Sequence, residues 1–487
     1  MRTGLDYLST LSKERDEREV YLDGERVEDV TRHPAFAPIT RTIAELYDLA
    51  ADPPNGMTYL APETGQQANT VFSIPRSRAD LTARRAAITS WARHTHGWVG
   101  RSPDHVGSFI AAFAAHPEQF ATTPHDLGAN VVGYHRQLLE DSRYVSYAII
   151  PPQVSRADTA GSWAGNFIQV GVVEARPEGL LLRGAQMLAT GAAVADDLFV
   201  SCIKPLTAED REFAVGFVVP VATPGLKLYC RRPYAPAATS VYDYPLSSRY
   251  DESDALVVFE DVLVPWDRVF VDRDVDGLRR QFFGTGAHVL GNWQAQIRFM
   301  VKLQFLAGLA HKIATANGTD RFPGVQEKLG ELAGLAVTVE SAVTAAEYLA
   351  EPDDAGMWLP VPRMVYGVMS LQAELYPRVL AILRELAGGG VLQLPSSAAD
   401  LLNPATRVDL CRYVQSPGLP ADERVKLFKL VWDAVGSEFA GRHHQYEMFY
   451  AGAPFVAKGY AYRNYGYDQH AGNVDRFLAG YQLDSPA

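Results

Sequence analysis

The strongest constraint on the fold is the order in which two hydrophobic periodicities follow each other along the 487-residue chain. Apolar residues recur at helical spacing to about residue 145. Short β-branched runs separated by glycine and proline then extend to about residue 272, and long helical stretches follow. Segregated helices and strands are typical of α+β architectures. We therefore expect an N-terminal helical domain over 1–146, a central β-sandwich or barrel over 147–272, and a C-terminal helical bundle with a short tail over 273–487.

Individual elements can be placed within these three regions. The expected strands are 167–173, 179–185, 198–202, 213–221, 226–230 and 255–265, several of which alternate apolar and polar residues as half-buried antiparallel strands do. The expected long C-terminal helices are 294–315, 325–349, 364–387 and 422–450. In the N-terminal region a helix is predicted to begin at Pro103, with Ser102 as its N-cap.

The composition excludes several classes of function. The chain has 57 acidic against 45 basic residues, a net charge of -12, and an acidic surface repels nucleic acid. The cysteines Cys202, Cys230 and Cys411 are odd in number and widely spaced, which disfavours a disulfide framework or a thiolate metal site. The sequence shows no signal peptide and no clear membrane-spanning run. We expect a cytoplasmic protein without a metal site or a membrane partner.

Nucleotide-binding motifs are missing from the sequence. The segment 284–286, Gly-Thr-Gly, lacks the third glycine of a Rossmann motif, and the three glycines at 388–390 follow a predicted helix instead of a strand. Walker, HExxH and GxSxG motifs are also absent. A nucleotide cofactor would therefore have to bind between subdomains.

Five colinear segments carry a specific family likeness. They are YLDGERV at 21–27, GWVGRSPD at 97–104, YDYPLSSR at 242–249, LPSSA at 394–398 and WDAVGSEF at 432–439. Together they resemble the oxygenase (large) component of 4-hydroxyphenylacetate 3-monooxygenase, a family of two-component flavin-dependent monooxygenases. The resemblance implies an acyl-CoA dehydrogenase-like fold with N-terminal helices, a central antiparallel β-domain and a C-terminal four-helix bundle. It also implies a homotetramer, with FAD between the β-domain, the bundle and an adjacent subunit.

The resemblance implies the reaction as well. FAD, reduced by a separate NAD(P)H-flavin reductase, reaches the oxygenase by diffusion and reacts with O2. The resulting flavin C(4a)-hydroperoxide transfers oxygen to the ring carbon ortho to a phenol hydroxyl. Water must then be kept from the flavin, and the phenol oxygen must meet a base or a cation. The expected substrate is a tyrosine-like or other aromatic phenol, free or tethered to a carrier protein, with specialised metabolism as one setting.

Three residues are expected at the phenol oxygen. The family uses an Arg and a Tyr one helical turn apart, and a His before a Pro-Pro segment. Here Arg101 keeps the Arg position, His105 stands at the Tyr position and Tyr147 at the His position, so Tyr and His are exchanged. The spacing of Arg101 and His105 predicts that they share one helix face. We expect Arg101 to bind the anionic oxygen, His105, with an ordinary pKa near ~6.5, to act as base, and Tyr147 to donate a hydrogen bond.

Four residues are assigned to the cofactor from the family pattern. Thr190, in LATGAA at 188–193, matches the Thr that approaches the isoalloxazine ring. Arg249, Gln326 and Arg442 match cofactor or subunit-interface positions, and arginines are suited to a pyrophosphate because of their bidentate geometry.

Two residues are assigned to the substrate. Asp196 ends a segment that in the family often reads Leu-Thr-His. A carboxylate there that faced the pocket would repel a free acid and suit an amino group. His288 lies ahead of the helix that begins near residue 293, close to a His that contacts the phenol oxygen in chlorophenol-using relatives.

Other reactions stay open at this point. The exchanged Tyr and His, together with Asp196, leave room for N-oxygenation of an amine by the same hydroperoxide. An acyl-CoA dehydrogenase-like flavin oxidation would need a Glu base in the bundle, which no motif places. A catalytically dead flavin-binding protein is disfavoured because Arg101 and Thr190 are kept. A related radical dehydratase acting on 4-hydroxybutyryl-CoA needs iron–sulfur cysteines near Arg101, and the nearest cysteine, Cys202, is far along the chain.

Overall fold

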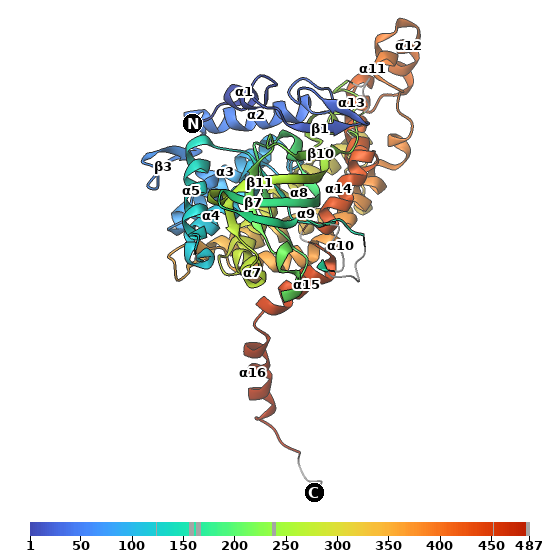
Figure 1. Cartoon of the computed structure of the whole chain (residues 1–487). Helices are drawn as coiled ribbons and strands as arrows, with labels where there is room; N and C mark the ends of the chain where they lie inside the picture. The colour runs from blue at the N-terminus through green and yellow to red at the C-terminus, as the bar shows by residue number, and fades with distance from the viewer. Residues whose placement is uncertain (123, 155–159, 162–166, 236–239, 451, 484–487) are drawn as a thin grey trace.

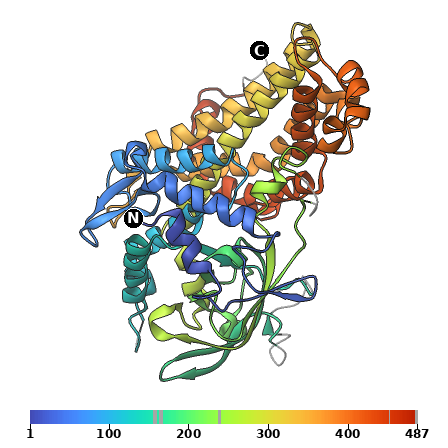
Figure 2. The ribbon, with the colours of Figure 1, turned by 90° about the horizontal axis from the view of Figure 1, so that it is seen from above.

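Helices, strands and helices follow one another in the predicted order (Figure 1). The computed structural model describes residues 1–122, 124–154, 160–161, 167–235, 240–450 and 452–483. Seen from above, the β-domain lies on one side of the body and the long bundle helices on the other, with N-terminal helices beside both (Figure 2). The three predicted regions therefore meet in the middle of the molecule.

The N-terminal region is mostly helical. Its helices are α1 (Gly4–Leu11), α2 (Ala37–Ala51), α3 (Arg78–His94), α4 (Pro103–Ala115) and α5 (Leu127–Asp141), and its strands are β1 (Glu19–Leu22), β2 (Glu25–Val27), β3 (Thr58–Ala61) and β4 (Gln66–Asn69). Helix α4 begins at Pro103 as predicted. Ser102 lies at its N-cap, but the Ser102 hydroxyl donates to the Asp104 carboxylate and makes no capping bond to the helix backbone.

The middle region forms two sheets. Its elements are β5 (Val145–Ala148), β6 (Gly171–Arg176), β7 (Gly179–Thr190), β8 (Asp197–Val200), β9 (Gly216–Pro220), β10 (Leu226–Cys230), α6 (Ser247–Tyr250), β11 (Asp254–Pro265) and β12 (Val269–Val271). The strand orders are β2-β1-β10-β11-β7-β6 and β12-β9-β8-β5.

Most ladders in these two sheets are antiparallel, as expected. Two are parallel: β1 pairs with β10 and β5 pairs with β8. In each parallel pair one strand, β1 or β5, precedes the predicted strands in the sequence. A long connection therefore separates it from its partner, as parallel pairing requires. Strands β1 and β2 thus join a sheet that the sequence placed wholly between residues 147 and 272.

The C-terminal region is helical. Its elements are α7 (Val275–Phe283), α8 (Ala287–Ala316), α9 (Pro323–Tyr348), β13 (Glu351–Pro352), β14 (Trp358–Leu359), α10 (Pro362–Ala387), α11 (Ala398–Leu402), α12 (Pro404–Tyr413), α13 (Ala421–Val435), α14 (Glu438–Phe449), α15 (Pro454–Asn464) and α16 (Tyr467–Leu478). The helix predicted over 422–450 is in fact two, α13 and α14. A Cβ at Gly436 would lie 2.4 Å from the Trp432 ring, and the Ser437 side chain caps α14 by accepting from the Ala440 backbone N–H.

Two parts of this region bear on the environment of the protein. Among the described residues, α9 alone is long and apolar enough to cross a membrane, and 28% of its most apolar stretch is buried. In this structure α9 packs against α8 and α10. Core helices of soluble proteins pass the same test, so this is weak support for a membrane span. Helix α16 extends away from the body toward the C-terminus (Figure 1), and none of its residues is buried.

Candidate active site

Arg101 lies in the bend just before α4, buried among aromatic rings. Its guanidinium carbon is 4.1 Å from the centre of the Tyr450 ring, 4.8 Å from that of Tyr147 and 5.4 Å from that of Tyr446. Over the ranges that the structure describes, no carboxylate forms an ion pair with this guanidinium. The Glu252 carboxylate acts on the Arg101 charge from nearby and favours the charged form, but on Arg101 it bonds only to the backbone N–H. The guanidinium is therefore left with N–H groups that an anionic ligand could accept from.

His105, in the first turn of α4, is in direct contact with Arg101. The Arg101 Nη1 donates to His105 Nε2 over 2.7 Å. Burial, and then the charge of Arg101, hold the pKa of His105 well below its ordinary value, so the ring is neutral. The two residues do not share a helix face as predicted, because Pro103 starts the helix after Arg101. The guanidinium reaches His105 from the preceding bend.

Tyr147 completes the predicted group. It lies on β5, and its ring centre is 5.4 Å from that of His105. In the part of the chain that the structure describes, its hydroxyl has no hydrogen-bond partner. Burial raises the pKa of Tyr147, which keeps the hydroxyl protonated. The O–H is therefore available as a donor beside Arg101 and His105.

An apolar wall closes one side of this group. The Phe109 ring is 5.1 Å from that of His105 and 6.3 Å from that of Tyr147, and it packs against Phe282. Gly291 of α8 allows this packing, since a Cβ there would lie 2.0 Å from the Phe109 ring. The wall favours exclusion of water from the side of His105 that faces the bundle.

A polar network joins Thr190 to Arg101. The Thr190 hydroxyl, at the end of β7, donates to Asp254 over 2.6 Å, and Arg442 of α14 donates to the same carboxylate over 2.9 Å. Arg442 also pairs with Glu252 at 3.4 Å, and Glu252 accepts from the Arg101 backbone N–H over 2.6 Å. Burial raises the pKa of Asp254, but Arg442, Arg231 and Thr190 together outweigh it, and the net shift is downward. Thr190 and Arg442 are therefore brought to the Arg101 group through two carboxylates.

Sequence reasoning missed several members of the site. Gln294 of α8 bonds to His105, and Tyr450, directly after α14, packs on Arg101. Glu252 and Asp254 stand close after the YDYPLSSR motif, which was the one signal that could have pointed to them. Gln294 and Tyr450 are placed by tertiary packing alone, and no local pattern marks them.

Two predicted substrate residues make other contacts. Asp196 is buried, and its carboxylate accepts from Arg2 over 2.6 and 2.9 Å and from the Tyr144 backbone N–H over 2.7 Å. His288 bonds to the Tyr366 hydroxyl at 2.9 Å and packs on Tyr460, and burial lowers its pKa to about 4. Because both side chains are engaged away from Arg101, we leave them out of the site proposed below.

Two predicted cofactor residues lie on the surface. Arg249 of α6 is exposed, and its carbonyl accepts from the Thr42 hydroxyl over 2.9 Å. Gln326, in the first turn of α9, is also exposed. Neither contacts the Arg101 group within one chain.

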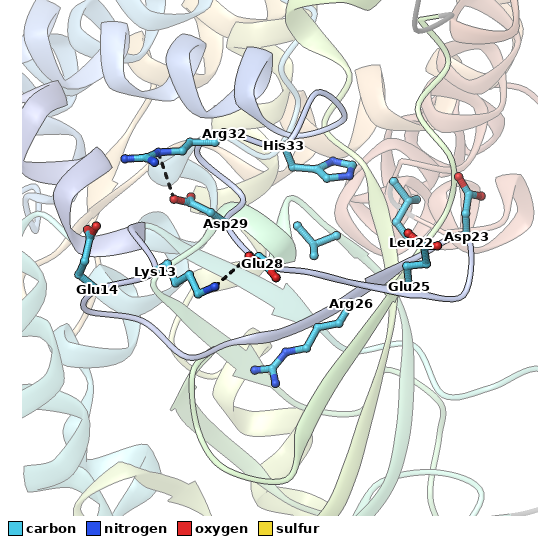
Figure 3. Close-up of a pocket in the computed structure, with 11 residues that line it drawn as sticks. Lys13, Glu14, Leu22, Asp23, Glu25, Arg26, Glu28, Asp29, Arg32 and His33 are labelled. Carbon is cyan, nitrogen blue, oxygen red and sulfur yellow. Dashed lines mark hydrogen bonds and ion pairs between the residues drawn. The ribbon is translucent and has the colours of Figure 1, made fainter.

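A surface pocket lies elsewhere, between the β1–β2 hairpin and the segment leading to α2 (Figure 3). Its volume is about 630 Å³, and it is lined by side chains of both signs, with a Lys13–Glu28 pair at 2.8 Å. None of the predicted site residues lines it. No cluster of three or more His, Cys, Asp or Glu arranged for a metal ion occurs in the described ranges.

Comparisons with known proteins show which family the chain belongs to. Family models for the 4-hydroxyphenylacetate 3-hydroxylase N terminal and C terminal match residues 3–271 and 278–479. The chain is 36% identical over 457 residues to the pyoverdin chromophore biosynthetic protein PvcC of Pseudomonas aeruginosa, covering 93% of this chain and 89% of that one. It is 39% identical over 456 residues to (3S)-3-amino-3-(3-chloro-4-hydroxyphenyl)propanoyl-(peptidyl-carrier protein SgcC2) monooxygenase of Streptomyces globisporus, covering 92% and 85%.

A solved structure agrees with the fold. The oxygenase component HpaB of 4-hydroxyphenylacetate 3-monooxygenase, complexed with FAD and 4-hydroxyphenylacetate, superposes with a TM-score of 0.92 at 34% identity over 99% of both chains. The family, the α+β fold, the enzyme class and the FAD cofactor predicted from the sequence are confirmed. This chain belongs to the 4-hydroxyphenylacetate 3-hydroxylase family and is the oxygenase component of an FAD-dependent monooxygenase.

Proposed function

We propose that this oxygenase hydroxylates a phenol ortho to its hydroxyl group, and that Arg101, His105 and Tyr147 hold the phenol oxygen. One observation carries the proposal: the buried Arg101 guanidinium is surrounded by aromatic rings and has no carboxylate partner among the described residues. A phenolate has a flat apolar ring and a negative charge, so its ring suits the aromatic side chains and its charge suits the guanidinium.

Each side chain has a stated task. Arg101 binds the phenol oxygen and favours its anionic form. His105, neutral because of burial and the neighbouring Arg101, is able to accept the phenol proton. Tyr147 donates a hydrogen bond to the oxygen, and the Phe109 wall keeps water away. Ionisation of the phenol makes its ortho carbon electron-rich, which is what attack on an electrophilic oxygen requires.

The residues present fit the FAD that the family binds. The Tyr446 ring packs on Arg101, and its buried hydroxyl has no hydrogen-bond partner in the described ranges, so it is free for a polar group of a ligand. Thr190, at the end of β7, and Arg442, both bonded to Asp254, would be the other residues to hold the cofactor. Reduced FAD, when bound, supplies the oxygen-activating chemistry.

The experiment supplies reduced FAD and O2 to the purified oxygenase with a panel of phenols, and measures a mass gain of one oxygen ortho to the hydroxyl. Arg101→Ala and His105→Ala should both lose this product. Unchanged hydroxylation in both variants would remove the site from consideration. Product from a matched panel of amines alone would instead favour N-oxygenation.

We propose further that the substrate is a tyrosine-like phenol of specialised metabolism. The support is the similarity to PvcC and to the Streptomyces globisporus monooxygenase, whose name specifies an aromatic β-amino acid on a peptidyl-carrier protein. Comparing free tyrosine analogues with the same analogues loaded on a carrier protein tests this. A preference for simple phenols over both would contradict it.

We also propose that the oxygenase works as a homotetramer in the cytoplasm, with FAD delivered by a separate NAD(P)H-flavin reductase. Exposed apolar side chains on the projecting α16, among them Val474, Phe477 and Leu478, are suited to packing on a second copy. Assembly would also bring the exposed Arg249 and Gln326 to a cofactor shared between subunits. Light scattering on the whole chain and on a chain ending after Tyr465 tests this, and a tetramer without α16 would contradict the role of that helix.

A further inference from the structure

A continuous line of hydrogen bonds runs from Asp104 to Arg101 through the inside of the protein. Gln294 Nε2 donates to the Asp104 carboxylate over 3.1 Å, and His105 Nδ1 lies 3.1 Å from Gln294 Oε1. His105 Nε2 lies 2.7 Å from Arg101 Nη1. All four side chains are buried, and two of them, Asp104 and His105, come from the same turn of α4.

The carboxylate end fixes the direction of the bonds from Asp104 to His105. Arg101 Nη1 lies 2.7 Å from His105 Nε2 and 3.5 Å from Nδ1, over the ring and not along the Nε2 lone pair, so this contact does not by itself choose the tautomer. A carboxylate only accepts, so Gln294 turns its NH2 to Asp104 and its carbonyl to His105. The Nδ1 of the neutral ring must then carry the proton and donate it to Gln294. Asp104, acting through Gln294, thus selects the tautomer of His105 that leaves a lone pair on Nε2.

The other groups that face His105 do not reverse this direction. Tyr147 reaches it from β5, Arg298 from α8 and Tyr450 from the end of α14. The Tyr450 hydroxyl is 3.3 Å from Nδ1 and 3.4 Å from the Gly100 carbonyl, so it can accept from Nδ1 while it donates to that carbonyl. Arg298 is a cation and accepts nothing.

We propose that Gln294, held by Asp104, is a positioning residue that keeps the Nε2 lone pair of His105 ready for the phenol proton. This rests on the proposed function of Arg101 and His105. The phenol oxygen enters between those two side chains and replaces their mutual bond with two of its own. The O–H bond then breaks, the proton forms a bond with Nε2, and the electron pair stays on the oxygen beside Arg101.

The same line of bonds stabilises the state after the transfer. The new imidazolium donates from Nδ1 to Gln294, which in turn is bonded to the Asp104 carboxylate. Burial raises the pKa of Asp104, while its bonds from Ser102 and Gln294 and the nearby buried charge of Arg84 act against that rise. Proton transfer thus turns a neutral phenol and a neutral His105 into a phenolate beside Arg101 and an imidazolium that is linked to Asp104 through Gln294. The net charge of the site does not change.

The test uses 4-nitrophenol, whose ionised form is coloured, as the probe. It is bound anaerobically to the oxygenase with reduced FAD present, so that no turnover occurs, and the absorbance of the bound nitrophenolate is followed against pH. In Gln294→Leu the Nδ1–H loses its acceptor, and we expect the pKa of the bound phenol to rise by about one unit, a tenfold change in its ionisation constant. Affinity for the preformed phenolate at alkaline pH should change by less than about twofold, because Arg101 is still present.

Three further variants sharpen the readout. Gln296→Leu is the matched control, since Gln296 is buried on the same helix and bonds to Gln372 at 3.1 Å without touching His105. It should leave the pKa of the bound phenol unchanged. Gln294→Glu should restore the wild-type value, because a buried protonated Glu offers the same acceptor and donor as Gln. Asp104→Asn should raise the pKa of the bound phenol. An Asn can donate to the Gln294 carbonyl, so the Gln294 amide can flip and no longer accept from His105 Nδ1.

The outcomes separate this inference from the proposed function. A Gln294→Leu variant that ionises the probe like the wild type overturns the role of Gln294. If that variant does not fold, Asp104→Asn with a wild-type pKa overturns it equally. Arg101→Gln tests the underlying site: if it binds nitrophenolate as tightly as the wild type does, the proposed phenol site itself is wrong.

Discussion

Two buried arginines lie side by side against the same tyrosines and have opposite surroundings. Arg298 of α8 is 1% exposed, and its guanidinium pairs with Glu447, which also pairs with Lys302 at 2.9 Å. Arg101 packs on the same Tyr450 ring, 4.1 Å against 5.2 Å for Arg298, and has no carboxylate partner in the described ranges. The compensated arginine, which is paired with a carboxylate, is part of the architecture, whereas we propose that the uncompensated one, which has no direct carboxylate partner, is kept for a ligand. The comparison predicts that the two clusters respond to mutation in different ways.

The largest effect is expected from removing the carboxylate of the compensated cluster. Glu447→Gln leaves Arg298 buried without a counter-charge and removes the group that supports the charge on Lys302, and breaking such a pair costs about 3–5 kcal/mol. Denaturant unfolding should show this loss. Glu374→Gln, which breaks an exposed pair with Lys458 at 2.7 Å, is the control and should leave the unfolding midpoint nearly unchanged. Equal midpoints for the two variants would show that the buried cluster is not structural.

The uncompensated arginine should show the reverse pattern. Arg101→Gln removes a cation that has no direct carboxylate partner in the described chain, although Glu252 acts on it from nearby, so we expect the unfolding midpoint to stay nearly the same. Hydroxylation should fall about 10²–10³-fold, the range typical of losing one group that stabilises a developing anion. Product formation with reduced FAD and thermal unfolding measure the two quantities. A midpoint as low as that of Glu447→Gln would erase the distinction between the two arginines.

The compensated cluster also predicts a pH dependence of stability. Burial lowers the pKa of Lys302 from 10.5 to about 7, although Glu447 acts to raise it. Between about pH 7 and pH 10.5 the unfolded chain binds more protons at this lysine than the folded chain does. The free energy of unfolding therefore increases as the pH rises from about 7 to 10.5. Lys302→Met removes the titrating group. Urea unfolding of both proteins across the window should give a flatter slope for the variant, and parallel slopes would contradict the buried titration.

A smaller effect on stability is expected from Asp196→Asn. Asp196 pairs with Arg2 at 2.6 Å and holds the Tyr144 backbone N–H, and the Tyr144 hydroxyl donates to the Arg101 carbonyl over 2.7 Å. Arg2 also bonds to the Thr10 hydroxyl and the Ser142 carbonyl, so it keeps part of its hydrogen bonding, and we expect a loss of about 2 kcal/mol, below the range for a charge left wholly without partners. The relative turnover of free acids and amines should not change. A shift in that preference would mean that Asp196 faces the substrate after all.

Local patterns predicted the order of the elements and the start of α4, because proline at a first helical turn acts within a few residues. The Arg101–His105 contact was also within reach, since the two are four residues apart. Asp196 was misplaced because its partner, Arg2, is 194 residues away and belongs to no pattern. Gln294 was missed for the same reason. No local sequence pattern distinguishes it from other helical residues, and only the tertiary structure shows that it contacts His105.

The smallest effect is expected from Tyr147→Phe, which removes only the hydroxyl beside Arg101 and leaves the guanidinium in place. That hydroxyl has no partner in the described chain, so its loss should leave the unfolding midpoint unchanged, as with Arg101→Gln. Hydroxylation should fall only about tenfold, because one neutral donor to the phenol oxygen contributes about 1–1.5 kcal/mol. The bound nitrophenol should ionise at a slightly higher pH, since the phenolate loses a donor while Arg101 remains. A loss as large as that of Arg101→Gln would make Tyr147, and not the uncompensated guanidinium, the main contact of the anion.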